Sequence, residues 1–156
     1  MIHLNNLLVA VNFDEASNDA LVYARGLAKN FGARLHVLHV MENVFLRPMA
    51  NDPRAVEAGI TRRLLDSLTD EDRTALHAVP VIRKSDAPAD EIVKYAQSEG
   101  IDLIVMGTHG RPGLAHFLMG SVAEKVVRMA PCPVLTLRHP EREFVVADAT
   151  APVSST

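Results

Sequence analysis

Short, mainly apolar runs alternate with amphipathic stretches along this chain of 156 residues. The first run, residues 7–11, contains no polar residue, which is typical of a strand covered on both faces in a parallel sheet. Further strands are expected at residues 34–40, 78–82, 103–106 and 134–137. Strands that alternate with helices favour right-handed crossovers. The sequence therefore predicts an α/β fold, a three-layer open parallel five-stranded sheet with helices on both faces.

Capping residues mark the expected helices between these strands. Asp52 followed by Pro53 is typical of a helix start, and Pro80 places the third strand at a sheet edge. The other helices are expected to begin near Ser17, Thr69, Pro88 and Ser121. In the last of them, the apolar spacing predicts that three side chains face inward: Val122, Val126 and Met129.

Length and charge limit the classes of function. The length predicts one domain, residues 1–140, and a small, polar and partly disordered tail at 141–156. A net charge of −3 and the absence of Trp argue against nucleic acid and an anionic membrane surface as partners. The sequence offers no signal peptide and no membrane span, so a cytoplasmic location is expected. Cys132, between two prolines, is interpreted as a small apolar residue rather than a nucleophile.

A glycine-rich stretch follows the fourth expected strand. The strand breaks at Gly107, Gly110 follows, and Gly120-Ser121 opens the last helix. Glycines allow backbone N–H groups to approach an anion closely, and a helix start presents unpaired donors with partial positive charge. The order of strand, glycine turn and helix therefore suits a phosphate. It is not a Walker loop, because Met119-Gly120 rather than a Lys precedes Ser121.

Each polar residue near this stretch also has a purely structural interpretation. Ser121 and Glu124 form a capping-box pattern that would satisfy the helix donors without a ligand. Arg111 could reach a phosphate or be a solvated loop residue, and His109 could donate to a phosphate or have no partner. Asn12, at the end of the first strand, could bind a base or sugar edge or simply open a turn.

Three segments carry a family resemblance: residues 102–111, Gly120-Ser121 and residues 130–135. With the order of elements from Leu7 to Leu137, they resemble the universal stress protein family. The spacing G-x2-G-x9-G-S resembles that of the subgroup that binds ATP. The resemblance implies strand order 3-2-1-4-5, an adenine nucleotide (ATP, or ADP or AMP) at the ends of the first and fourth strands, and a homodimer made through the fifth strands. We expect Mg²⁺ to accompany the nucleotide.

The resemblance also assigns positions around the nucleotide. It implies that the base and ribose end is formed by Val11, Asn12 and Val40. It implies that the pocket is lined by Met106 and Gly107. The phosphate end is implied to be formed by His109, Gly110, Gly120, Ser121 and Val122. Arg111 is added from its place after Gly110. The chain departs from the family at Asn12, where Asp is usual, at Ala123, where ATP-binding relatives can have Thr, and at Asp86-Ala87-Pro88, where Gly-x-Pro is usual.

Three functions are compatible with these residues. The first is a nucleotide-binding, stress-response regulatory protein whose partner protein the sequence does not name. The second is a slow ATPase or other nucleotide-dependent enzyme; only His109 and Asp14 are candidates for its base. The third is a dimerisation module without nucleotide, against which the intact glycine spacing argues. Fold alone does not decide among them.

Overall fold

The computed structural model describes residues 1–41, 52–109 and 121–139, with only the backbone of His109 and Ser121. The connection at 42–51, Gly110, Arg111, Gly120 and the tail at 141–156 lie outside the described residues. The elements in chain order are β1 (Asn6–Ala10), α1 (Glu15–Phe31), β2 (Arg34–Met41), α2 (Pro53–Asp66), α3 (Asp70–Thr74), β3 (Val79–Lys84), α4 (Pro88–Ser98), β4 (Leu103–His109), α5 (Ser121–Met129) and β5 (Val134–His139).

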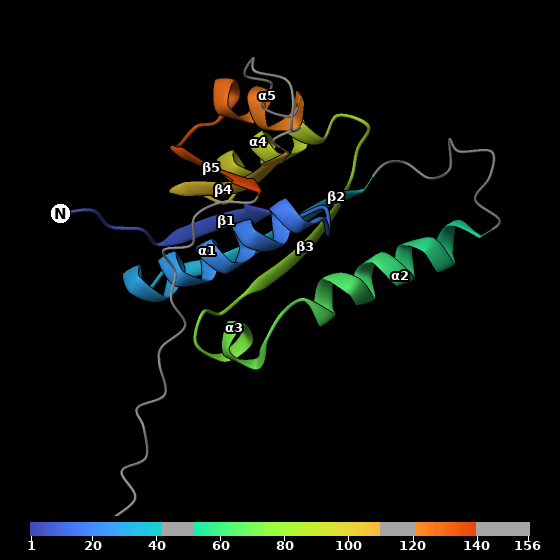
Figure 1. The fold of residues 1–156 in the computed structure, drawn as a ribbon, viewed down its shortest axis with the longest axis horizontal. Coiled ribbons are helices and arrows are strands. Elements are labelled where there is room, and N and C mark those ends of the chain that lie inside the picture. The colour runs from blue at the N-terminus through green and yellow to red at the C-terminus, as the bar shows by residue number, and fades with distance from the viewer. Residues whose placement is uncertain (42–51, 110–120, 140–156) are drawn as a thin grey trace, which may run out of the picture.

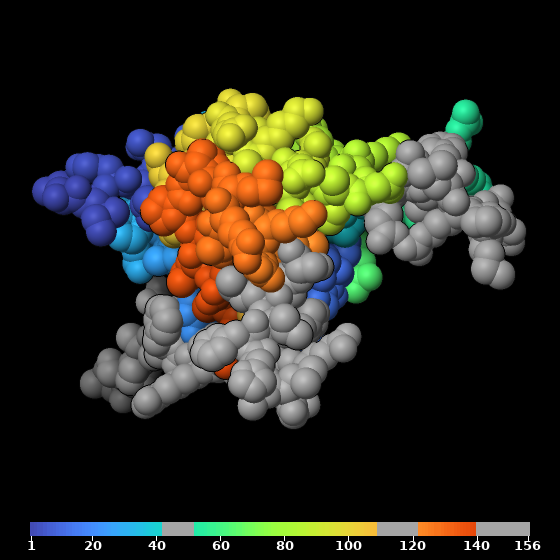
Figure 2. All heavy atoms as spheres, turned by 90° about the horizontal axis from the view of Figure 1, so that it is seen from above, coloured from blue at the N-terminus to red at the C-terminus, as the bar shows by residue number. Residues whose placement is uncertain are grey.

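The five strands form one parallel sheet in the order β3-β2-β1-β4-β5, as expected. Side chains of α1 and of the α2–α3 region form an apolar core with one face of the sheet. Helices α4 and α5 form a second core on the other face, where they lie side by side (Figures 1 and 2). The predicted three-layer α/β fold is confirmed.

Several boundaries differ from the sequence predictions. Helix α1 begins at Glu15 instead of near Ser17, because the Asp14 side chain caps it by accepting from Ser17 N at 2.7 Å. Strand β4 does not break at Gly107 but continues to His109, because β5 extends beside it to His139. The prediction that Met129 faces inward is wrong: it is 48% exposed at the very end of α5.

Gly107 permits an unusually close contact between β4 and α1. A Cβ at this position would overlap the backbone of Ala16 and lie 2.7 Å from Ser17 N. Glycine inside a strand is expected where another backbone segment approaches closely. The start of α1 therefore rests directly on the carboxyl-terminal half of β4.

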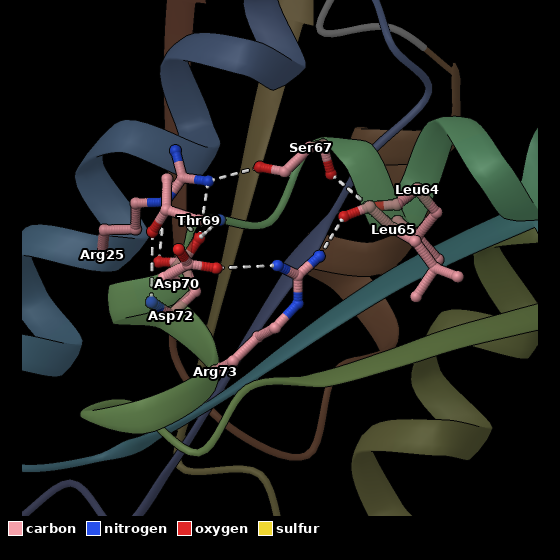
Figure 3. A network of polar contacts seen from close by, with 8 residues as sticks. All are labelled: Arg25, Leu64, Leu65, Ser67, Thr69, Asp70, Asp72 and Arg73. Atoms are coloured by element: carbon pink, nitrogen blue, oxygen red, sulfur yellow. Dashed lines mark hydrogen bonds and ion pairs between the residues drawn. The ribbon is translucent and has the colours of Figure 1, made fainter.

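A buried ion pair fixes α1 to the α2–α3 connection (Figure 3). The Asp72 carboxylate is 1% exposed, and the Arg25 Nη2 atom lies 2.7 Å from it. Arg25 also donates to the carbonyl of Ser67 at 2.6 Å, and Thr69 N donates to Asp72 at 2.8 Å. Burial alone would raise the pKa of Asp72, but the bonds from Arg25 and Thr69 outweigh it and lower that pKa.

His139 connects the end of β5 to α1. Its Nδ1 lies 2.6 Å from Asp19 and its Nε2 lies 3.0 Å from Glu15. Both ring nitrogens can donate to carboxylates only when the imidazole is protonated. The hydrogen bond to Asp19 is the main reason why the pKa of His139 is raised, with the negative charges of Asp19, Glu15 and Asp14 adding to it.

Replacing Gly107 with Ala should destabilise the fold, because the new methyl group has to displace the α1 backbone. We expect the free energy of unfolding to fall by about 3 kcal/mol in urea denaturation. Gly59→Ala in α2 is the control: apart from the helix's own backbone and the adjacent residues, no atom of the described residues lies within 4 Å of the added Cβ. That variant should gain up to about 1 kcal/mol from helix propensity. Equal stabilities for the two variants would contradict the proposed close contact.

His139 should make stability depend on pH. A raised folded-state pKa stabilises the fold fully below the unfolded value of about 6.5, and this stabilisation is lost as pH rises through the folded value. Urea denaturation between about pH 6 and pH 9 should show the free energy of unfolding decreasing. His139→Gln should remove part of this decrease, while His3→Gln, in the exposed N-terminal segment, should keep it. If the free energy of unfolding changes with pH in the same way for His139→Gln and for the parent, the ion pairs of His139 do not contribute.

Candidate functional site

A cavity of about 210 Å³ opens at the carboxyl ends of the central strands. It is bounded by the ends of β1, β2 and β4, by the start of α1, and by α4 and α5. This is the point where the strand order reverses between β1 and β4, which is where ligands bind in open α/β sheets. Six residues predicted from the sequence line it: Val11, Asn12, Val40, Met106, Gly107 and Val122.

The remaining predicted residues are placed only in part. The backbone of His109 ends β4, and the backbone of Ser121 begins α5, one residue before Val122 at the cavity wall. The side chains of His109 and Ser121, and all of Gly110, Arg111 and Gly120, lie outside the described residues. The structure thus brings together residues more than a hundred positions apart, from Val11 to Val122.

Six other residues line the cavity that sequence reasoning did not single out: Ala10, Ser17, Leu38, Ser85, Pro88 and Ile92. Ser85 directly follows β3, so the rule that ligands lie beyond strand ends could have suggested it. A second cavity, of about 270 Å³, shares Pro88 and Val122 with the first. It lies between the start of α4, which follows β3, and the start of α5, and its lining contains one of the predicted residues, Val122.

Asn12 has the structural role that its alternative interpretation described, although it also lines the cavity. Its side-chain oxygen accepts from Asp14 N at 3.2 Å, which closes a local turn. Its own backbone N–H donates to Ser17 Oγ at 3.2 Å. The end of β1 and the start of α1 are therefore held together by polar contacts at the cavity wall.

The histidines and the cysteine have structural environments. His36 Nδ1 lies 2.8 Å from the Tyr95 hydroxyl, and His39 Nδ1 donates to the Val11 carbonyl at 2.7 Å. The two histidines lie on opposite faces of β2, as their spacing predicts. Burial, with the nearby charge of Asp102, raises the pKa of the Cys132 thiol, which disfavours the nucleophilic thiolate.

Within residues 1–41, 52–109 and 121–139, no group of three or more His, Cys, Asp or Glu side chains is arranged to hold a metal ion. In the same part of the chain, no helix has the length and apolar character needed to cross a bilayer.

Comparisons with known proteins agree with this architecture. The model of the universal stress protein family matches residues 3–138. A universal stress protein of Methanocaldococcus jannaschii is 31% identical over 148 residues, which cover 88% of this chain and 84% of that protein. Two solved structures share the fold at lower identity. One, from Archaeoglobus fulgidus in complex with dAMP, has a TM-score of 0.62 at 23% identity and covers 86% of this chain and 98% of its own. The other, a universal stress protein in complex with cAMP, has a TM-score of 0.60 at 23% identity and covers 87% and 98%. The chain belongs to the universal stress protein family.

Proposed function

We propose that this protein binds an adenine nucleotide, ATP with Mg²⁺, in the cavity at the strand ends. It then acts as a regulatory stress-response protein rather than as a fast catalyst. The observation that carries the proposal is the position of the cavity at the β1–β4 switch point, with six of the predicted residues in its wall. The dAMP and cAMP complexes of proteins with this fold support an adenine nucleotide as the ligand.

The size of the cavity supports a proposed position for each part of the nucleotide. About 210 Å³ is less than the roughly 300–1,000 Å³ typical of sites for drug-sized ligands. The cavity therefore suits the base and ribose, beside Val11, Asn12 and Val40, while the phosphates extend towards the start of α5. There the N–H groups of the helix start and the glycine-rich stretch, with Gly120 and Ser121, provide donors.

The enzyme alternative is less well supported. Asp14 is a carboxylate that the sequence offered as a base, but its side chain caps α1 through Ser17 N. A carboxylate engaged in that bond is less available to activate water, and in-line attack on a phosphate needs a positioned water as well as a cradle. We therefore favour binding with slow hydrolysis at most.

We also propose a homodimer formed through β5. This strand is at the edge of the sheet, and three of its side chains, Val134, Leu135 and Thr136, are only half-buried. Val127 of α5 is 43% exposed. An edge strand with an apolar surface is normally covered or paired with another chain.

Nucleotide binding can be measured directly by calorimetry. We expect a dissociation constant for Mg·ATP in the micromolar range, or about −8 kcal/mol. Gly120→Val should weaken binding by about 100-fold or more because a side chain would occupy the space of the phosphates. Ser121→Ala should lower affinity and also stability, the latter by about 1 kcal/mol.

Gly59→Ala, outside the cavity wall, is the control for that series and should bind like the parent. An absence of heat and of thermal stabilisation with millimolar ATP would refute the proposed function. Parent-like binding by Gly120→Val would instead show that the phosphates lie elsewhere.

The dimer is tested by light scattering on purified protein. At tens of micromolar, on the order of what a micromolar interface requires, the molar mass should be twice that of the 17.0 kDa chain. A molar mass of one chain at this concentration would argue against pairing through β5.

A further inference from the structure

Phe13 has a strained backbone next to the proposed nucleotide site. Its φ is 66°, in the left-handed region, and it directly follows Asn12 in the cavity wall. A bulky residue rarely adopts this conformation, which persists only where the surrounding structure holds it. The polar contacts of Asn12 and Ser17 account for the inner side of this turn.

Two side chains that do not line the cavity hold the outer side of the turn. The Arg63 guanidinium lies 4.7 Å from the centre of the Phe13 ring, and its Nη2 donates to the Phe13 carbonyl at 3.3 Å. The ring of His39 is centred 4.6 Å from that of Phe13, while its Nδ1 donates to the Val11 carbonyl. A cation over an aromatic face is an attractive arrangement, and the Phe13 and His39 rings are in contact at a tilt of 35°.

Arg63 lies near the carboxyl end of α2, where the helix is anchored. Leu64, the one buried residue of α2, is 1% exposed and belongs to the core, and Arg73 donates to the Leu65 carbonyl at 2.7 Å. A surface ion pair between Glu57 and Lys84, 2.6 Å long, connects this helix to β3, and such pairs contribute little. In Figure 1, α2 lies beside β3, at the edge of the sheet. The buried side chain of Leu64 therefore keeps its neighbour Arg63 in place beside the turn at Phe13.

We propose that Arg63 is a positioning residue that holds the turn at Phe13 and thereby shapes the nucleotide site. Its guanidinium stabilises the left-handed turn and so fixes Val11 and Asn12 in the cavity wall. Without these contacts the turn relaxes and the site loses its shape. The proposal rests on the proposed function for its ligand. Because coupling is reciprocal, nucleotide binding would also strengthen the contact between Arg63 and Phe13.

The chain offers a closely matched pair of variants. Arg63→Ala removes the contacts with Phe13. Arg62→Ala removes the same type of residue from the next position of α2, where Arg62 is 85% exposed and pairs only weakly with Asp66, at 3.9 Å. Arg63→Lys keeps a cation near the ring and should retain part of the effect.

The first measurement needs no nucleotide. Hydrogen exchange of the folded, ligand-free protein should be faster at the amides of Asn12 and Asp14 in Arg63→Ala than in the parent. Arg62→Ala should leave both rates unchanged. Equal rates at these amides in the two alanine variants would overturn the proposal, whatever the protein binds.

The second measurement is the affinity for Mg·ATP. Arg63→Ala should weaken it about fivefold, and Arg62→Ala should not change it. Phe13→Leu should weaken it as well, and the double variant Phe13→Leu/Arg63→Ala should lose no more than the weaker-binding single variant, because both act through one contact. Additive losses, or parent-like binding by Arg63→Ala, would overturn the proposal. If the parent protein binds no adenine nucleotide, the proposed function fails, while the exchange rates still decide whether Arg63 holds the turn.

Discussion

The close contact between Gly107 and the backbone at Ala16 organises the whole candidate site. Because β4 carries no side chain at this point, the start of α1 can rest on the strand. Ser17 is thereby brought to the end of β1, where its hydroxyl accepts from Asn12 N. The cavity wall on this side thus consists of three segments that meet only because one residue has no Cβ. A substitution at Gly107, which itself lies in the cavity wall, would also alter the site by displacing the start of α1.

Helices α1 and α2, which lie on the same face of the sheet, are attached to the rest of the protein in different ways. Helix α1 is fixed along its length, by the close contact at Gly107 and by the buried pair of Arg25 and Asp72 (Figure 3). Removing one partner of such a buried pair leaves an uncompensated charge, so α1 cannot shift cheaply. Helix α2 is anchored near its carboxyl end, where Leu64 is buried and Arg73 donates to the Leu65 carbonyl at 2.7 Å. The turn at Phe13 is contacted from both helices, because Asn12 beside it bonds to Ser17 of α1 and Arg63 of α2 lies over the Phe13 ring.

The sequence predicts the fold better than it predicts the site. Apolar runs and capping residues identify all five strands and the helices between them, because both signals are local. The sequence does not indicate that β4 extends beyond Met106, because Thr108 is polar. Thr108 is buried only because its hydroxyl donates to the Leu137 carbonyl of β5. Ser17 and Ser85 reach the cavity through the crossover connections, whose geometry no short motif encodes. The glycines are recognisable because a close backbone approach requires them wherever it occurs.

Asn12, where the family usually has Asp, is consistent with this local geometry. Its side-chain oxygen accepts from Asp14 N, a role that a carboxylate could fill equally well. Asp14 already places one carboxylate at this turn, where it caps α1, and the charge of Glu15 follows directly. A further carboxylate at position 12 would add like-charge repulsion among these groups. The amide keeps the hydrogen bond that forms the turn and removes that repulsion. The departure at Asn12 therefore preserves the turn and lowers the negative charge of the cavity wall, so under the proposed function its effect on binding should appear in the recognition of base and ribose.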